Sequence, residues 1–341
     1  MVKQEIKNFT LGELEREIEN IKEPSYRAKQ IFFWIYKKGS RAFEEMDNIP
    51  EALRNKLKEK YCISAPTPVE RLKSSDGTEK FLFRLKDGSF IESVLIPARD
   101  RNTVCLSTQV GCKHGCSFCA SGLKGFVRNL DASEILNQIL FLEYGLGCRI
   151  TNFVFMGMGE PLDNYENVSK AISVMTEPEG MNISAKRITV STCGIVPGIK
   201  ALRTLKAGIN LSVSLHAADD AVRSVLMPVN KKYPLKDLLK ACSDFAKTAK
   251  GTITFEYVLI KGKNDSLKNA DQLAAVAKKL NAKVNLLVYS SVPQFNFEPS
   301  AEKDIKAFME RLAGEKIKVT LRRSKGKDIA AACGQLAGRR Q

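Results

Sequence analysis

Three cysteines lie within eight residues in the stretch 111-GCKHGCSFCASG-122, where Cys112, Cys116 and Cys119 have the spacing C-x3-C-x2-C. Thiolates so close together bind zinc or an iron–sulfur cluster. A structural zinc site usually needs four ligands. No second CxxC pair supplies the fourth, and His114 lies inside the triplet, where reaching the same metal would be strained. The triplet therefore favours a cubane cluster with one iron left open, while zinc and a chance grouping stay as alternatives.

Polar residues also follow three later apolar runs. The run ITNFVFM leads into 157-GMGEPL-162, whose glycines allow a close backbone approach and whose Glu160 can accept a hydrogen bond from an ammonium group. RITVST ends near Ser191, and INLSVSL leads into 214-SLH-216. Each alone is as easily an ordinary loop residue. Because the carboxyl ends of parallel strands share one edge of a sheet, together they indicate a cofactor cleft beside the triplet.

Two further thiols attract attention. Cys333 lies in a run of small residues, 328-DIAAACGQLAGRR-340, where it is poorly placed to pack a core. Cys105 lies in the strand-like run just before the triplet, where a buried cysteine is often only a small hydrophobe. The chain has nine cysteines, and an odd, clustered set indicates metal ligands and reactive thiols rather than a disulfide framework.

The elements that must position these residues change along the chain. Residues 1–62 read as a small helical unit, and residues 63–100 as a short β extension with turns at SDG and KDG. From 101 to 325, apolar runs alternate with helix-length segments, which predicts a parallel α/β architecture, either barrel-like or doubly wound. One helix is expected to begin with a capping box at Asp131 and Glu134 and to end at Gly145. Residues 326–341 form a C-terminal segment.

The composition favours a polyanionic partner. The 341 residues are 44% hydrophobic and include 54 Lys and Arg against 38 Asp and Glu, a formal charge of +16. Such an excess most often serves nucleic-acid binding, although a basic protein can lack that partner. The first residues do not resemble a signal peptide, and no apolar run approaches the roughly 18 residues of a membrane span. We therefore expect a cytoplasmic protein with no membrane partner.

Together, these residues resemble one family of radical S-adenosylmethionine (SAM) enzymes, the RlmN/Cfr family of RNA methyltransferases. The resemblance spans nearly the whole chain and includes PSYRAKQIFFWIY, VCLSTQVGC, the cysteine triplet, GFVRNL, FVFMGMGEPL, VSLHAADD and FEYVLIKGKNDS. GMGEPL is closer to RlmN than to Cfr, which has Ala after the Glu. The resemblance implies an α/β fold, a partial (β/α)6-type radical SAM barrel with an N-terminal helical accessory domain and a short β extension.

The resemblance also implies the cofactors and their ligands. Cys112, Cys116 and Cys119 would hold a 4Fe–4S cluster, and two molecules of SAM would be used per turnover. The positions that match the family's SAM contacts are Gly159, Glu160, Ser191, Ser214, Leu215 and His216. The family also has an asparagine after a late strand, in a run like NLIPWN. This chain reads NLLVYS there, so that Ser290 replaces the asparagine.

The resemblance assigns catalytic roles to three residues. Cys333 would be methylated by one SAM and then carry the methyl group to adenine C2 as a carbon radical, which leaves a protein–RNA adduct. Glu92 would remove the C2 proton. Cys105 would form a transient disulfide with Cys333 and so release the product. An electron-poor carbon such as adenine C2 cannot attack the methyl group of SAM directly, which is why radical chemistry is needed.

The implied function is methylation of adenine C2 in 23S ribosomal RNA and in tRNA. Two alternatives are Cfr-type methylation at C8 and, from another class, a non-catalytic RNA-binding protein stapled by a metal. The expected partners are the two RNAs and an external electron donor such as flavodoxin, and the chain is expected to be a monomer. Candidate phosphate contacts lie in residues 1–62 and in the basic stretch from Lys316 to Lys327.

Overall fold

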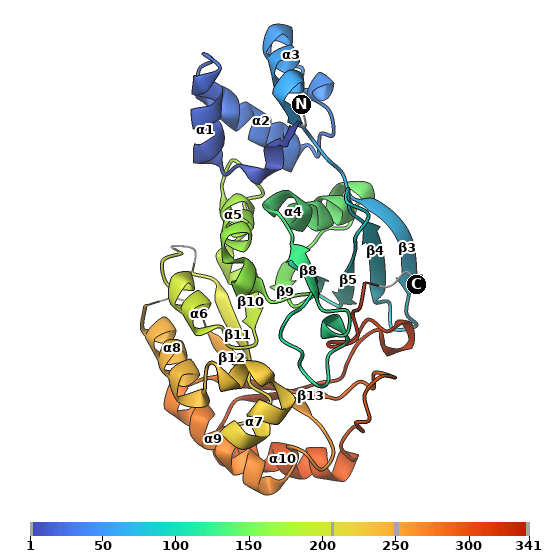
Figure 1. Cartoon of the computed structure of the whole chain (residues 1–341), viewed down its shortest axis with the longest axis vertical. Helices are drawn as coiled ribbons and strands as arrows, with labels where there is room; N and C mark the ends of the chain where they lie inside the picture. The colour runs from blue at the N-terminus through green and yellow to red at the C-terminus, as the bar shows by residue number, and fades with distance from the viewer. Residues whose placement is uncertain (1–2, 206–207, 249–251, 339–341) are drawn as a thin grey trace.

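A ten-stranded mixed sheet organises the chain in the computed structural model, which describes residues 3–205, 208–248 and 252–338 (Figure 1). The strand order is β14-β13-β12-β11-β10-β9-β6-β5-β4-β3. Neighbouring strands from β6 to β14 are parallel. Their bounds are β6 Arg101–Cys105, β9 Asn152–Phe155, β10 Ile188–Thr192, β11 Asn210–Ser214, β12 Ile253–Leu259, β13 Lys283–Val288 and β14 Val319–Arg322.

Helices connect these parallel strands. They are α4 Ala132–Leu140, α5 Tyr165–Thr176, α6 Val196–Leu202, α7 Asp220–Leu226, α8 Leu235–Thr248, α9 Leu267–Leu280 and α10 Glu302–Gly314. The strands follow one another in the sheet in chain order, without the reversal that defines a doubly wound sheet. The barrel-like alternative is therefore the correct one, and the predicted partial (β/α) barrel is confirmed.

The β extension continues the same sheet. β3 (Thr67–Lys73), β4 (Glu79–Arg84) and β5 (Phe90–Ala98) pair antiparallel with one another, and β5 pairs antiparallel with β6. A separate hairpin of β7 (Gln109–Gly111) and β8 (Phe126–Asn129) follows β6. The triplet of cysteines lies in the loop of this hairpin.

The two faces of the main sheet differ in chemistry. On the outer face, Phe81 and Phe83 pack edge-on against Phe141, and Tyr257 lies 5.5 Å from Phe308 of α10 between ring centroids. On the inner face, polar side chains of neighbouring strands bond to one another. The inner face is therefore the one that can build a site.

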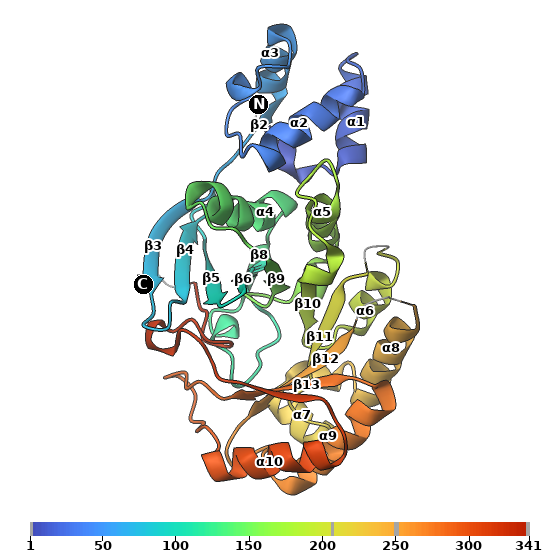
Figure 2. The same ribbon diagram turned by 180° about the vertical axis from the view of Figure 1, so that it is seen from behind.

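The N-terminal unit consists of α1 (Leu11–Asn20), α2 (Tyr26–Lys37) and α3 (Glu51–Lys60), with β1 (Gln4–Glu5) paired to β2 (Tyr61–Cys62). It sits over the ends of α4 and α5 in both views (Figures 1 and 2). Asn8 joins the unit to α4: its Nδ2 donates to Asp131 at 3.1 Å, and its Oδ1 accepts from the amide of Ser133 at 2.8 Å.

Local sequence signals explain several boundaries. Ala28, Ile31, Phe32 and Ile35, which recur at helical spacing in α2, are buried, and Gly39, just beyond the helix, has a φ of +69°. The capping box at Asp131 and Glu134 is present. The helical run ends at Gly145, as predicted, but its last turn, Phe141–Gly145, is π-helical, its C-cap residue is Leu146, and the left-handed residue is Gly147.

The C-terminal segment, residues 326–338, crosses from β14 to the opposite end of the sheet. The amide of Gly326 donates to Asp76 at 3.0 Å, Ser74 donates to Asp328 at 2.6 Å, and Lys80 donates to the carbonyl of Ala330 at 3.2 Å. The segment is drawn in red beside the ends of β3 and β4 (Figure 2). The segment thereby connects the two edge strands of the main sheet, β14 and β3.

Within the described residues, none of the helices has both the length and the apolar character that a membrane span needs.

Candidate active site

The loop of the β7–β8 hairpin carries the three clustered cysteines. Its neck is closed by the amide of Cys112, which donates to the carbonyl of Gly125 at 3.0 Å. A side chain at Gly111 would place its Cβ 1.9 Å from that carbonyl oxygen, so this position, with a φ of +75°, requires glycine. The amide of Ser117 donates to the carbonyl of Leu226 at 3.0 Å. The loop is thus fixed at its neck and against α7.

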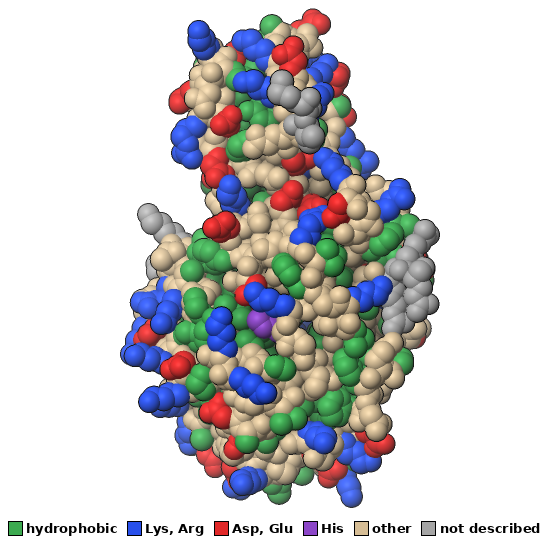
Figure 3. Space-filling model, in the orientation of Figure 1, with side chains coloured by type: hydrophobic (Ala, Val, Ile, Leu, Met, Phe, Trp, Pro, Cys, Tyr) green, Lys and Arg blue, Asp and Glu red, His purple; other side chains and the backbone are tan. Residues whose placement is uncertain are grey.

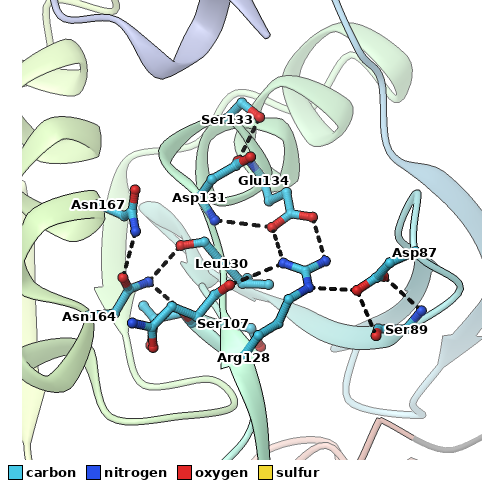
Figure 4. A network of polar contacts seen from close by, with 12 residues as sticks. Asp87, Ser89, Ser107, Arg128, Leu130, Asp131, Ser133, Glu134, Asn164 and Asn167 are labelled. Carbon is cyan, nitrogen blue, oxygen red and sulfur yellow. Dashed lines mark hydrogen bonds and ion pairs between the residues drawn. The ribbon is translucent and has the colours of Figure 1, made fainter. Parts of the chain in front are cut away.

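An ion-pair network holds the second strand of this hairpin (Figure 4). Arg128 binds both carboxylate oxygens of Glu134, at 2.7 and 2.9 Å, and its Nε donates to Asp87 at 2.6 Å. The side-chain amide of Asn164 donates through Nδ2 to the backbone carbonyls of Thr108 and Leu130, at 2.8 and 2.7 Å. These contacts tie the hairpin to α4, to the β4–β5 turn and to the loop after β9.

The side chain of His114 points to a carboxylate rather than to the three cysteines. Its Nε2 pairs with Asp163 in the 3-10 helix η5 (Pro161–Asn164), and Lys113 pairs with the same carboxylate at 3.2 Å. Although burial opposes it, hydrogen bonding to His114 holds the pKa of Asp163 below its usual value. His114 therefore links the triplet loop to the loop after β9 and is not a fourth ligand.

The donor set fits an iron–sulfur cluster. Burial raises the pKa of Cys112 to about 12 and that of Cys116 further, and the charge of Cys119 adds to both, so the three thiols are gathered in one electrostatic environment. No group of three or more His, Cys, Asp and Glu side chains in the described residues is arranged to hold a single metal ion. In a cubane each thiolate binds its own iron, so the sulfurs need not converge on one point. Three cysteines in one loop, with His114 engaged by Asp163, match the ligand number of a cubane that keeps one iron open.

The GMGEPL turn is shaped by packing against the strand that leads to the triplet. A Cβ at Gly157 would lie 2.6 Å from the amide nitrogen of Ser107, and one at Gly159 would lie 2.4 Å from Cβ of Gln109. Glu160 is buried, which raises the pKa of its carboxyl, and its oxygens accept from the amides of Leu162 at 3.0 Å and Cys193 at 2.7 Å. Each oxygen keeps a lone pair that an ammonium group can use.

The SLH motif follows β11 at the same edge. Leu215 is fully buried, its amide donates to the carbonyl of Glu256 at 3.0 Å, and its carbonyl accepts from Arg223 at 3.1 Å. His216 has a φ of +54°, and its Nδ1 accepts from the amide of Val258 at 3.0 Å. Burial lowers the pKa of His216 to about 3, so the ring is neutral and carries its proton on Nε2. The ring packs edge-on against Phe118 of the triplet loop, with 4.9 Å between centroids.

A buried arginine, which sequence reasoning missed, supports these loops. Arg223 of α7 is fully buried and donates to the carbonyl of Cys193 at 2.6 Å, to that of Leu215 at 3.1 Å and to Asn230 at 2.7 Å. It also donates to the carbonyl of Ser214 at 3.3 Å. Burial lowers its pKa, and the nearby thiols of Cys193 and Cys116 counteract that shift. In the sequence it resembles any arginine on an exposed helix face.

A polar row on the inner face was also missed. Glu256 of β12 accepts from Ser212 of β11 at 2.8 Å and from Asn285 of β13 at 2.9 Å. Ser191 lies beside Ser212 in the sheet register. The sequence signal that could have revealed this polar row is the charged Glu256 inside the apolar run TITFEYVLI. Ser290, beyond β13, donates to Ser324 at 2.9 Å and so ties this edge to the chain after β14.

Cys333 is brought to the triplet loop from more than 200 residues away. The amide of Ala120 donates to the carbonyl of Gly334 at 2.7 Å, and Ser121 donates to that of Leu336 at 2.7 Å. Cys333 is exposed overall, yet the surrounding chain desolvates its thiol and, with the charge of Glu256, raises its pKa to about 11. Burial raises the pKa of Cys105, and the charge of Cys333 raises it further; the two thiols form no disulfide. All nine cysteines are free thiols.

Glu92 of β5 lies under the same segment. It is buried, its Oε1 lies 3.0 Å from Nζ of Lys80, and its Oε2 accepts from the amides of Ala337 and Gly338 at 2.7 and 3.0 Å. The structure thus places the sequence-predicted Glu92, Cys105 and Cys333 around one C-terminal segment. Lys80 and the two amides were not expected from the sequence.

A sequentially ordered parallel barrel with a three-cysteine loop after its first strand has the architecture of a radical SAM enzyme, and comparisons with known proteins agree. The radical SAM superfamily matches residues 106–274, and the ribosomal RNA large subunit methyltransferase N-terminal domain matches residues 4–63. A crystal structure of a radical SAM methyltransferase from Sphaerobacter thermophilus superposes with a TM-score of 0.92 at 42% identity, covering 98% of this chain and 100% of that one.

Curated relatives narrow the class to a family. A probable dual-specificity RNA methyltransferase RlmN from Clostridium novyi is 46% identical over 332 residues, which cover 97% of each chain. A dual-specificity RNA methyltransferase RlmN from Syntrophus aciditrophicus is 45% identical over 337 residues, which cover 98% of this chain and 96% of its own. The chain belongs to the RlmN family of radical SAM RNA methyltransferases. The cofactors that this family implies are a 4Fe–4S cluster and SAM.

Proposed function

We propose that the protein methylates C2 of an adenosine in 23S ribosomal RNA and in tRNA, and that Cys333 carries the methyl group. The observation that supports this most strongly is the return of the C-terminal segment to the triplet loop, through Ala120 to Gly334 and Ser121 to Leu336. A cysteine with only a surface role has no need to lie between the cysteine triplet, Cys105 and Glu92.

The rim of the barrel would bind the cofactors. Cys112, Cys116 and Cys119 would hold the cluster, and Gly159, Glu160, Ser191, Ser214, Leu215, His216 and Ser290 would contact SAM. When bound, the two cofactors supply a 5′-deoxyadenosyl radical by reductive cleavage. Arg223 orients the SAM-side loops through the carbonyls of Ser214 and Leu215. The neutral ring of His216 can donate one hydrogen bond from Nε2 but adds no charge.

Three residues would carry the chemistry on the substrate. The methyl group on Cys333 would first lose one hydrogen atom to the 5′-deoxyadenosyl radical, and its carbon would then form the new bond to adenine C2. Glu92 would take the C2 proton, as general bases do when held within reach of it, and one electron would pass from the adduct to the cluster. The thiolate of Cys105 would then attack the sulfur of Cys333, so that the bond from that sulfur to the transferred carbon breaks, a transient disulfide forms, and the released carbon takes a proton to become the methyl group of the product.

The structure adds a condition to the role of Glu92. One of its oxygens accepts two backbone amides from Ala337 and Gly338, and the other faces Lys80. Hence the end of the C-terminal segment must move away before the adenine edge can reach the carboxylate. Movement of the same segment lets Cys333 approach two partners in turn.

RNA binding would use the whole molecule. Residues 1–62 would form the accessory domain, 63–100 the β extension, 101–325 the barrel and 326–341 the catalytic segment. The accessory domain has thirteen Lys and Arg against eleven Asp and Glu, so most of the basic excess lies elsewhere. Figure 3 shows both signs of charge mixed on that domain. In the basic stretch 316–327, Arg323 already pairs with Glu302 at 2.8 Å.

The reaction needs one external electron donor, and a flavodoxin is our candidate. We also infer that the protein acts as a monomer in the cytoplasm, because the catalytic residues proposed here all come from one chain.

Nucleoside mass spectrometry tests the proposal. Unmodified 23S ribosomal RNA and tRNA are incubated without oxygen with the reconstituted protein, SAM and a reductant. The proposal requires 2-methyladenosine, and the RNA that carries it identifies the substrate. If only 8-methyladenosine forms, the activity is of the Cfr type. If the protein cleaves SAM but modifies neither RNA, the substrate assignment is wrong.

A further inference from the structure

The loop that holds the cysteine triplet ends in an apolar tip, which we define as residues 123–127. Leu123, Phe126 and Val127 are 43%, 43% and 60% exposed. Among the described residues, eight large hydrophobic side chains are similarly exposed, and three of these eight lie within this five-residue tip. Single exposed hydrophobic residues are common, but a contiguous group usually marks a contact surface.

The backbone of the tip is firmly held, so its side chains cannot simply fold inward. The amide of Leu123 donates to the carbonyl of Ala120 at 3.0 Å, and the amide of Gly125 donates to that of Gly122 at 3.1 Å. Gly125 has a φ of +71° and accepts from Cys112. Phe126 and Val127 begin β8, which pairs only with β7 in a two-stranded sheet. The apolar groups are therefore displayed by an ordered turn.

The tip adjoins the proposed reaction centre. Ala120 and Ser121, just before it, donate to the carbonyls of Gly334 and Leu336, which follow Cys333 in the catalytic segment. Two cations belong to the same loop: Lys124 lies within the tip and is exposed, and Lys113 is 54% exposed and pairs with Asp163 at 3.2 Å. Apolar side chains beside flexible cations suit a ligand with flat faces and phosphates, such as unpaired RNA.

We propose that the apolar tip binds the unpaired bases next to the target adenosine and holds the extruded base at the reaction centre. This inference rests on the proposed function, since an adenine inside a helical stack cannot present C2 to Cys333. Extruding a base costs a few kcal/mol of stacking, and contacts with apolar or aromatic side chains offset part of that cost.

A protein electron donor is the other macromolecule that must approach this region. A stable protein–protein interface buries roughly 800 Å² on each partner, which three side chains cannot supply alone. One or two stacked bases need much less area. The tip therefore favours RNA, and the donor becomes an outcome of the test.

The test uses the double variant Phe126→Ser, Val127→Ser in the cluster-loaded full chain. The matched control is Leu267→Ser, which changes an equally exposed residue (53%) at the start of α9. The probe is an RNA stem–loop with the target adenosine replaced by 2-aminopurine, whose fluorescence rises on unstacking. Binding of the same stem–loop is followed by fluorescence anisotropy, and iron content shows that the cluster is retained.

We expect the double variant to bind the stem–loop about tenfold more weakly and to lose most of the fluorescence rise, while the control matches the parent protein. Unchanged binding and fluorescence would overturn the inference. So would a variant that slows only reduction by flavodoxin and not by dithionite, because the tip would then serve the donor. If the parent protein binds and unstacks the RNA but never methylates an adenosine-containing version, the proposed function fails while the tip contact stands.

Discussion

The two faces of the main sheet show how one sheet serves both stability and chemistry. On the outer face, aromatic residues of the strands pack against helices, as Phe81 and Phe83 do against Phe141. On the inner face, strands β5, β6 and β12 present Glu92, Cys105 and Glu256 toward the C-terminal segment. Alternate residues of the same strands thus belong to different environments.

The difference teaches that the inner face must be held by polar partners rather than by packing. Burying an uncompensated polar group is costly, and most of the inner groups described here have a named partner. Glu256 is held by Ser212 and Asn285, and Glu92 by Lys80 and two amides. Changes on the inner face should therefore affect the reaction most, and changes on the outer face should affect stability most.

The largest expected effect is that of Cys333→Ala. Methylation should fall below detection because no other thiol can carry the methyl group to the RNA, while iron content and thermal unfolding stay unchanged. The comparison variant Cys116→Ala should lose the cluster as well as the activity. Nucleoside mass spectrometry and iron analysis measure the two effects separately. Residual methylation by the Cys333→Ala variant would contradict the assignment of the reaction to the inner face.

Glu92→Gln should reduce methylation by about 10²- to 10⁴-fold, since it removes a general base. The earlier bond to adenine should still form, so a covalent protein–RNA adduct should accumulate. Denaturing gel electrophoresis with labelled RNA detects it. Glu79→Gln in the neighbouring strand serves as the control, because Glu79 pairs with Arg71 instead. Adduct levels equal to those of the control would remove Glu92 from the mechanism.

Phe255→Ala tests the outer face. Phe255 is fully buried, on the same face of β12 as Tyr257, and a cavity of this kind costs about 3–5 kcal/mol of unfolding free energy. Urea unfolding measures the loss. Turnover per folded molecule should stay within a few-fold of the parent value. A selective loss of turnover in a fully folded variant would show that the two faces are not separable.

Glu143→Gln should give the smallest effect and stabilise the protein. Burial in the outer helical layer raises the pKa of Glu143 from 4.5 to about 7. Between pH 4.5 and about 7, the carboxyl of Glu143 therefore stays protonated in the folded state but is ionised in the unfolded state. The free energy of unfolding falls as the pH rises through this range. The variant should lose this dependence and gain up to about 3 kcal/mol at pH 7.5. The urea unfolding midpoints of the parent protein and the variant are measured at pH 5 and at pH 7.5. If the midpoints of the two proteins differ by the same amount at both pH values, the burial of Glu143 is contradicted.

Much of this arrangement was predictable from local sequence. The apolar runs ITNFVFM, RITVST and INLSVSL are rich in β-branched residues, and each contains a strand of the barrel, β9, β10 and β11. The clustering of Cys112, Cys116 and Cys119 is visible because all three lie in one loop. The positions of Cys333, Cys105 and Glu92 came only from the family resemblance, since their proximity depends on how the C-terminal segment crosses the sheet.

Other features depend on tertiary contacts that no local pattern encodes. Arg223 differs from an exposed arginine only because the chain segments at the ends of two strands, β10 and β11, converge on it. The helical run does end at Gly145, but the local pattern did not predict that its last turn, Phe141–Gly145, is π-helical. The role of His114 as the partner of Asp163 follows from the loop after β9 and not from its place among the cysteines.

The central claim is that Cys333 carries the methyl group, and peptide mass spectrometry with isotope-labelled SAM tests it most directly. The reconstituted protein is first incubated with methyl-labelled SAM in the absence of reductant, then washed and given RNA, unlabelled SAM and reductant. The account predicts label on the peptide containing Cys333 after the first step and in 2-methyladenosine after the second. RNA that acquires only unlabelled methyl groups, or label on any other cysteine, would contradict it.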